Sequence, residues 1–194
     1  KQLTDGAKEL AKKYNAIGLR IEPDIEKDDQ AFRDIVTNLG YKIKDDAKDL
    51  EKWLSNPVVL EYYEGRDQVF DMDKVQKKFY SYNPQKIRCI IEYEEKKIGY
   101  LQYYNLDEED INLYLDSDCK DVCYGVDLFI GEPNYWNKGI GTEVMKKVIG
   151  YLVSDKEAQY VMVDPQCRNI RAIHCYEKCG FKKSKIVEEH ELHE

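Results

Sequence analysis

The 194-residue chain is predicted to be an α+β protein with a mixed, mostly antiparallel sheet and flanking helices. Three patterns support this fold class. Helical spacing of apolar residues dominates up to residue 79, and alternation over 87–104 indicates a β-hairpin. Strands and helices then alternate to residue 181, as they do in sheet proteins covered by helices.

Each element follows from local signals. Phe32, Ile35, Val36 and Leu39 repeat at helical spacing, and Gly40 follows them at a typical helix end. Ser55-Asn56-Pro57 ends another helix, since the residue before proline disfavours helical geometry. The expected helices are 2–13, 27–38, 45–54, 72–79, 138–153 and 169–179; the expected strands are 16–21, 41–44, 87–93, 98–104, 122–130 and 160–163, with another opening at 180–181; residues 58–65 and 107–121 are expected to form a turn and a loop.

Composition excludes several functions. The net charge is −8, which argues against binding the phosphate backbone of nucleic acids and allows a cationic partner. No apolar run approaches the length of a membrane span, and residues 1–5 lack the apolar core of a signal peptide. We therefore expect a cytoplasmic protein with no membrane or nucleic-acid partner.

The cysteines and histidines do not predict a metal site. The six cysteines are too sparse for a disulfide scaffold, and reduced thiols are the simpler interpretation. The three-residue gap in Cys175/Cys179 alone does not exclude metal. His190 and His193 are three apart on a polar tail, unlike the helical pair of zinc proteases.

The most informative segment is a glycine loop between an apolar strand and a helix. Its sequence over residues 131–142 is GEPNYWNKGIGT. Gly139 and Gly141 allow backbone N–H groups to approach a ligand, and the helix N-terminus attracts anions. The spacing fits neither a Walker loop nor a dinucleotide fingerprint. On the glycines alone, a plain strand-to-helix turn remains open.

A second segment, residues 164–181, reads DPQCRNIRAIHCYEKCGF and contains Asn-x-x-Ala-x-x-x-Tyr-x-x-x-Gly-Phe. Together the two segments resemble the GNAT N-acetyltransferase superfamily. The runs YGVDLFIGEPNYWNKGIGT and VDPQCRNIRAIHCYEKCGF, with LEYYEGRD at 60–67 and EEHELHE at 188–194, are similar to aminoglycoside 6′-N-acetyltransferases. The resemblance covers about residues 40–194.

This resemblance implies a GNAT fold with splayed central strands and acetyl-CoA as the donor. Residues 128–130 would part from 160–163 and pair their backbone with the pantetheine arm, as in strand addition. The superfamily often begins this loop with Arg or Gln. This chain has Trp136 there, so the basic contact would fall to Lys138. The implied cofactor-binding residues are Phe129, Ile130, Trp136, Asn137, Lys138, Gly139, Ile140, Gly141, Thr142 and Asn169.

The resemblance also implies the catalytic residues. Asp127, within an apolar strand, would hold the acceptor ammonium and receive its proton; the alternative is an inter-strand salt bridge. Tyr176 would donate a proton to the CoA sulfur; the alternative is a core aromatic. Asp164 matches an aminoglycoside-binding position, although it could be only a turn residue before Pro165.

An acceptor that is polycationic needs carboxylates and aromatic faces. Residues 61–67 supply both, and the acidic loop 107–121 could supply more or be merely solvated. The expected substrate-binding residues are Trp53, Tyr62, Tyr63, Glu64, Asp127 and Asp164.

Two parts of the chain depart from the family pattern. Residues 1–39 are expected to be an N-terminal extension, and residues 40–194 the acetyltransferase domain. Within the extension, residues 16–41 weakly resemble a segment of Fem-type aminoacyl transferases. Similar enzymes add one more strand after the position of Glu194, so either the chain is truncated, as from a bifunctional protein, or residues 16–22 take that strand's place.

The resemblance implies transfer of the acetyl group from acetyl-CoA to the 6′-amine of aminoglycosides, and hence antibiotic resistance. The alternatives are a GNAT enzyme for a polyamine or protein amine, a non-catalytic acyl-CoA-binding domain, and a Fem-like aminoacyl transferase.

Overall fold

The computed structural model describes residues 16–21, 43–66, 68–81, 83, 85–114 and 121–187. The expected helices 2–13 and 27–38 lie outside these residues. In the described part, no helix has both the length and the apolar character needed to cross a membrane.

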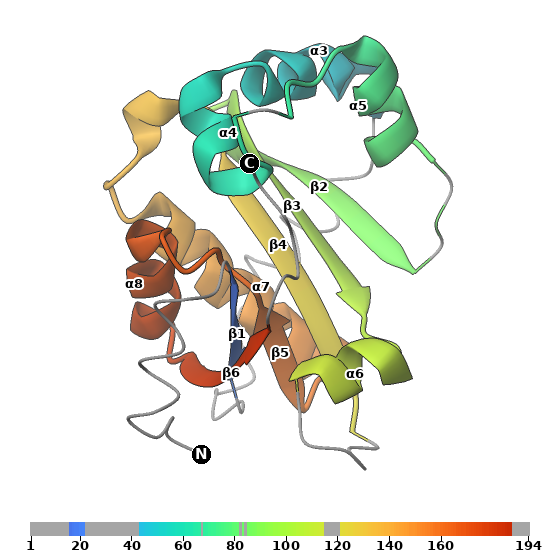
Figure 1. Cartoon of the computed structure of the whole chain (residues 1–194), viewed down its shortest axis with the longest axis vertical. Coiled ribbons are helices and arrows are strands. Elements are labelled where there is room, and N and C mark those ends of the chain that lie inside the picture. Colours follow the sequence, from blue (N-terminus) through green and yellow to red (C-terminus); the bar gives the residue numbers. More distant parts are fainter. Residues whose placement is uncertain are drawn as a thin grey trace.

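Six strands form one sheet in the order β2-β3-β4-β5-β1-β6 (Figure 1). Every neighbouring pair is antiparallel except β4 and β5, which run parallel. This is the mixed, mostly antiparallel α+β sheet that the sequence predicts. The strands are β1 Ala16–Ile21, β2 Lys86–Tyr93, β3 Lys96–Asn105, β4 Cys123–Ile130, β5 Tyr160–Val163 and β6 Lys182–Val187.

Strand β1 lies between β5 and β6 and is antiparallel to both. Leu19 is opposite Val163 of β5, and Ile17 is opposite Ile186 of β6. The interpretation that residues 16–22 take the place of a family strand requires this segment to lie in the main sheet, and residues 16–21 do lie there. A segment of the expected N-terminal extension therefore belongs to the same sheet as β4, the strand that precedes the glycine loop.

Helices cover both faces of the sheet. Val148, Ile149 and Leu152 of α7 pack with Ile173 and Tyr176 of α8 in one core. A second core joins α3, α4 and α5 to the side chains of Tyr100 and Phe129, and Figure 1 shows these three helices gathered at one end of β2–β4. The helices are α3 Ile43–Leu54, α4 Pro57–Tyr63, α5 Met72–Phe79, α6 Glu108–Tyr114, α7 Ile140–Lys156 and α8 Ile170–Lys178, with a 3₁₀ turn η1 at Pro133–Tyr135.

Three sequence predictions of local structure are wrong. A strand was expected at 41–44. Of these residues the structure describes 43 and 44, and both belong to α3, which begins at Ile43. The turn expected at 58–65 is mostly helix α4: Pro57 occupies its first turn, and the Asn56 side chain accepts a hydrogen bond from the Val58 N–H at 3.0 Å.

The loop expected at 107–121 begins with helix α6. The Asp107 carboxylate accepts a hydrogen bond from the Asp110 N–H at 2.9 Å, and three acids occupy the first helical turn. Acids there are stabilised by the helix dipole, so the acidic run that suggested a solvated loop favours a helix start.

The two central strands separate partway along their length. β4 pairs with β5 only over Cys123–Gly125 and Tyr160–Met162, while β4 continues to Ile130 with β3 paired along its other edge. The predicted splay of the central strands is confirmed. One edge of β4 is consequently left without a strand partner after Gly125.

The end of β4 packs tightly against α3. A Cβ atom at Gly131 would lie 2.2 Å from Cγ of the buried Trp53 indole. We expect Gly131→Ala to lower the free energy of unfolding by about 1–3 kcal/mol, because the ring or the backbone must move.

The matched control is Gly150→Ala within α7, where an added Cβ meets nothing within 4 Å. This change should raise the free energy of unfolding by about 0.5–1 kcal/mol through helix propensity. Urea unfolding measures both. Equal effects of the two substitutions would contradict the described contact with Trp53.

Candidate active site

A cavity of about 540 Å³ opens where β4 leaves β5. Its walls come from the end of β4, the glycine loop, the N-terminal end of α7, one side of α8 along its whole length, and α4. We call it the donor cavity. Of the residues expected to bind the cofactor, Phe129, Ile130, Trp136, Asn137, Gly139, Ile140, Gly141, Thr142 and Asn169 line it. Lys138 does not; it is exposed, and its ammonium lies 5.4 Å from the centre of the Tyr135 ring.

The glycine loop has the backbone geometry that its glycines predict. Gly139 has φ +80° and caps α7 with no side-chain hydrogen bond, and a Cβ there would enter open space. Asn137 also has a positive φ, +60°. The first N–H groups of α7 lack side-chain caps and border the cavity, an arrangement that suits an anion.

The exposed edge of β4 presents backbone groups to this cavity. The Trp136 indole N–H donates to the Ile130 carbonyl at 2.7 Å, whereas the Gly131 N–H donates to Ile98 at 2.8 Å in the direction of β3. Backbone polar groups alternate sides along a strand, so those of Leu128 face the same way as the Ile130 carbonyl. A ligand in the cavity can pair with Leu128 as an added strand would.

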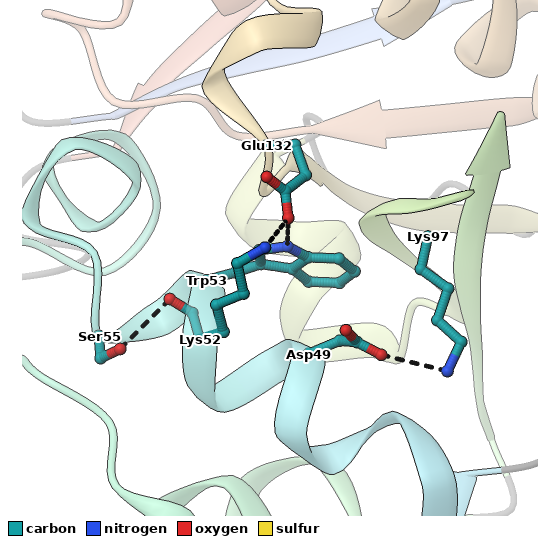
Figure 2. A network of polar contacts seen from close by, with 6 residues as sticks. All are labelled: Asp49, Lys52, Trp53, Ser55, Lys97 and Glu132. Atoms are coloured by element: carbon teal, nitrogen blue, oxygen red, sulfur yellow. Dashed lines mark hydrogen bonds and ion pairs between the residues drawn. The ribbon is translucent and has the colours of Figure 1, made fainter.

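The structure does not place Trp53 in an acceptor wall. Its side chain is 1% exposed, and its indole N–H donates to Glu132 at 2.9 Å. Lys52 pairs with the same carboxylate oxygen, and Figure 2 shows both donors directed at it. The expected contact of Trp53 with substrate does not fit this burial; the indole instead holds the start of the glycine loop against α3.

Helix α4 is tied to the start of α8 across the mouth of the cavity. Arg168 donates to the Glu61 carbonyl at 2.9 Å, and the Asn169 amide donates to the Tyr62 carbonyl at 3.4 Å. Asn169 also caps α8, accepting from the Ala172 N–H at 3.1 Å. Asn169 thus combines the helix-cap role with a place in the cavity lining.

The tyrosines and acids of α4 divide between two environments. Tyr62 and Tyr63 line the donor cavity, and the Tyr63 ring lies 4.5 Å from that of Phe129. Glu61 is ion-paired to Arg66, and Glu64 to Lys78. These carboxylates are already partnered, which weakens the expectation that Glu64 waits for a cationic substrate.

Asp127 lies on the sheet face opposite α7 and is only partly exposed. Its carboxylate accepts from the Gln102 amide and lies 3.5 Å from the Tyr104 hydroxyl. Burial, followed by the nearby carboxylate of Asp164, raises the pKa of Asp127 to about 7, against the opposing Gln102 hydrogen bond and the charges of Lys86 and Lys78. No salt bridge of the kind weighed from the sequence joins Asp127 to a cation among the described residues.

Of the three residues expected around the reacting groups, Tyr176 lies in the donor cavity, whereas Asp127 and Asp164 are not among its lining residues. Tyr176 is buried and lines the donor cavity. Burial raises the pKa of its phenol, and the charges of Cys175, Asp127 and Asp164 raise it further, so the phenol stays protonated at neutral pH. The cavity therefore contains a proton donor, and the two carboxylates are near enough for their charges to act on it.

Gln102 was missed from the sequence. It is 8% exposed, accepts from the Tyr100 hydroxyl at 2.9 Å and lies opposite Asp127 in the β3–β4 register. This chain of hydrogen bonds fixes its amide so that the N–H side faces Asp127. The available signal was a glutamine between apolar and aromatic residues of an expected strand.

Cys175 was set aside as an ordinary thiol, yet it lines the donor cavity. Its sulfur lies 3.3 Å from the Thr142 hydroxyl. Hydrogen bonds from Cys179 and Thr142 lower the pKa of Cys175 to about 6 despite partial burial, with help from the charge of Lys178. The other partly exposed described thiol, Cys167, has its pKa raised by burial.

We expect iodoacetamide to alkylate Cys175 at a rate that levels off above about pH 7, because the thiolate is then fully formed. Cys167 is the internal control, and its rate should still rise at about pH 9. Peptide mass spectrometry after timed quenching measures both in one sample. Identical pH profiles would contradict the thiolate stabilisation described here.

The chain belongs to the GNAT acetyltransferase family: residues 42–189 match the family model described as an acetyltransferase (GNAT) domain. It is 27% identical to aminoglycoside N(6′)-acetyltransferase type 1 of Klebsiella pneumoniae, over 79% of this chain and 80% of that protein. It is 35% identical to a kanamycin resistance protein of Rhizobium radiobacter, over 32% of this chain and 58% of that protein.

Solved structures agree on the fold. The structure of AAC(6′)-Ib in complex with ribostamycin and coenzyme A matches with a TM-score of 0.60 at 24% identity, covering 70% of this chain and 77% of that one. An aminoglycoside N(6′)-acetyltransferase from Legionella pneumophila matches with a TM-score of 0.55 at 20% identity, covering 74% and 83%. The GNAT fold implied by the sequence resemblance is thereby confirmed.

Proposed function

We propose that the protein transfers the acetyl group of acetyl-CoA to the 6′-amine of aminoglycoside antibiotics and so confers resistance to them, acting in the cytoplasm. One observation carries the proposal: a cavity with no acid in its described lining lies beside an open strand edge and contains Tyr176, whose pKa is raised by the nearby charges of Asp127 and Asp164. The curated relatives that share most of this chain are aminoglycoside N(6′)-acetyltransferases, and structural neighbours hold coenzyme A with ribostamycin or kanamycin.

The donor cavity fits acetyl-CoA in three respects. Leu128 offers unpaired backbone groups to the amides of the pantetheine arm, and the uncapped start of α7 offers N–H groups to phosphate. Gly139 has φ +80°, and a Cβ there would meet nothing within 4 Å, so the backbone is approachable from the cavity. Acetyl-CoA supplies the acyl group as a thioester.

Asp127, Leu128 and Tyr176 support direct transfer of the acetyl group from the thioester to the amine. The Asp127 carboxylate attracts the acceptor ammonium and takes its proton, which leaves the amine lone pair free to attack the carbonyl carbon. The Leu128 N–H faces the position where negative charge develops on the carbonyl oxygen. As the carbon–sulfur bond breaks, the Tyr176 phenol gives its proton to the departing sulfur, and the second proton that the nitrogen loses on forming the amide restores the phenol.

The direct test combines the purified protein with acetyl-CoA and follows free thiol. We expect thiol release with kanamycin, which has a 6′-amine, and none with an aminoglycoside bearing a 6′-hydroxyl. Release with neither acceptor would contradict the proposal. Equal release with both would show that the 6′-amine is not the acceptor.

Asp127→Asn should lower kcat/KM at least about a hundredfold, the usual scale for loss of a general base, while coenzyme A binding stays unchanged. The pH profile has a defined sign. Because the raised pKa of about 7 leaves Asp127 protonated at lower pH, wild-type kcat/KM should fall as the pH drops below 7.

The residual kcat/KM of Asp127→Asn should not fall as the pH drops below 7, because the variant has no carboxylate to protonate at this position. Asn112→Asp, on the exposed side of α6, is the control for an unrelated change of charge. Wild-type turnover by Asp127→Asn, or an unaltered pH profile, would remove the proposed role of the carboxylate.

One observation favours a second candidate, an N-acetyltransferase for an amine that is not polycationic. Lys78 and Lys86 both lie near enough to Asp127 to lower its pKa, and they line a hollow of about 500 Å³ with Lys74, Lys77 and Arg88. Such a surface repels additional cations and suits a protein amine with acidic neighbours. The same thiol assay with an acidic peptide bearing a free N-terminus, with spermidine and with kanamycin ranks the acceptors.

A further inference from the structure

The donor cavity differs in charge from the rest of the chain. The protein has a net charge of −8, yet no aspartate or glutamate is among the described residues that line this cavity. Arg171 and Lys178 are both in the lining. The cavity therefore suits an anion, and its basic side chains come from α8 instead of the glycine loop.

Arg171 occupies a specific position in this cavity. The carbon of its guanidinium lies 3.6 Å from the centre of the Trp136 ring and 4.7 Å from that of Tyr62. The two rings are nearly perpendicular, with an interplanar angle of 83°, and form a corner around it. A guanidinium stacked on an aromatic face keeps its N–H donors free in its own plane.

Among the described residues, no carboxylate neutralises the charge of Arg171. Burial lowers its pKa, and the only other contribution comes from Tyr62 instead of a carboxylate. Arginine nevertheless remains protonated in proteins. Among the described residues, Arg171 thus carries a half-buried positive charge with two aromatic faces for company and no acid.

The position of Arg171 in α8 makes its half-buried positive charge still less favourable. Arg171 is in the first turn of α8, at the positive end of the helix dipole, and that turn has no acidic residue. Asn169 already caps the helix through Ala172. A buried cation at a helix N-terminus is unfavourable unless an anion joins it, and here the adjoining space is a cavity.

We infer that Arg171 binds the pyrophosphate of the donor, in the contact that the sequence assigns to Lys138. The inference rests on the proposed acetyl-CoA donor. Trp136 belongs to the loop expected to hold the pyrophosphate, and its ring places the guanidinium beside that loop. A planar guanidinium can donate two parallel hydrogen bonds to phosphate oxygens, and the Trp136 face fixes its orientation.

The test is calorimetric binding of three ligands to wild type and Arg171→Gln, with no acceptor present. Coenzyme A carries the 3′-phosphate and the pyrophosphate, dephospho-coenzyme A keeps only the pyrophosphate, and pantetheine has neither. We expect Arg171→Gln to weaken the first two by about ten- to hundredfold, as for a lost charge-assisted hydrogen bond. Pantetheine should bind wild type and variant equally.

Two further variants separate charge, stacking and folding. Arg171→Lys keeps the charge without the planar fork and should recover only part of the affinity for coenzyme A. Lys156→Gln, at the far end of α7, removes one positive charge away from the cavity and should change nothing. A misfolded Arg171→Gln would lose pantetheine binding as well, and its unfolding transition would show it.

Several outcomes would overturn the inference. An equal loss for pantetheine would make Arg171 a structural residue. If Arg171→Gln weakened the binding of coenzyme A but not that of dephospho-coenzyme A, the contact would be with the 3′-phosphate and not with the pyrophosphate. A larger loss in Lys138→Gln than in Arg171→Gln would return the contact to the loop. These binding measurements contain no acceptor, so they remain interpretable even if the thiol assay shows no transfer to an aminoglycoside.

Discussion

The parting of β4 from β5 is the constraint on which the rest of the structure depends. The N–H and C=O groups along a β-strand edge are costly to leave unpaired where water is excluded, and folded proteins protect the edges that stay open. Here β3 holds the other edge of β4 along its whole length, while β5 pairs with only its first three residues. The Trp136–Ile130 hydrogen bond and the Trp53–Glu132 contact then fix the loop that follows. These contacts and the pairing with β3 hold the open edge of β4 in place beside the cavity.

The separation also divides the charges of the site. The described lining of the cavity contains no acid, whereas the carboxylates of Asp127 and Asp164 lie outside that lining and close enough for one to raise the pKa of the other. Tyr176 belongs to both regions, since it lines the cavity and responds to both carboxylates.

The net charge of −8 is not spread evenly through this arrangement. Glu61 and Glu64 are partnered by Arg66 and Lys78, so they do not form the free acidic wall that their sequence suggests. Asp127, by contrast, has no ion-pair partner among the described residues, and its carboxylate accepts a hydrogen bond from the Gln102 amide. Preference for a cationic acceptor then depends on a few buried or half-buried groups, whose effect is stronger than that of exposed carboxylates.

The sequence predicted those features that local patterns encode. The apolar strand before the glycine loop, the hairpin and the helix after Asn169 were predicted with near-correct bounds, and resemblance supplied the splay. The helix at 57–63 was missed because its tyrosines and acids suggested a turn. Its capping by Asn56 and Pro57 was the signal that could have revealed it.

Features that depend on tertiary packing could not be predicted this way. Trp53 was expected on a surface because aromatic residues suit sugars, but α3 turns it under Gly131. Gln102 acquires its role from the register of β3 with β4, and Arg171 from two rings on other elements. Neither arrangement is encoded in the spacing of neighbouring residues.

Amide hydrogen exchange at Leu128 tests the central claim most directly, because that claim concerns one open edge. Without ligand, the Leu128 N–H should exchange faster than the Phe129 N–H, which faces β3. Saturating coenzyme A should slow Leu128 at least about tenfold and leave Phe129 nearly unchanged, since only the open edge gains a partner. Protection confined to the glycine loop, with Leu128 unaffected, would contradict a donor arm paired to β4.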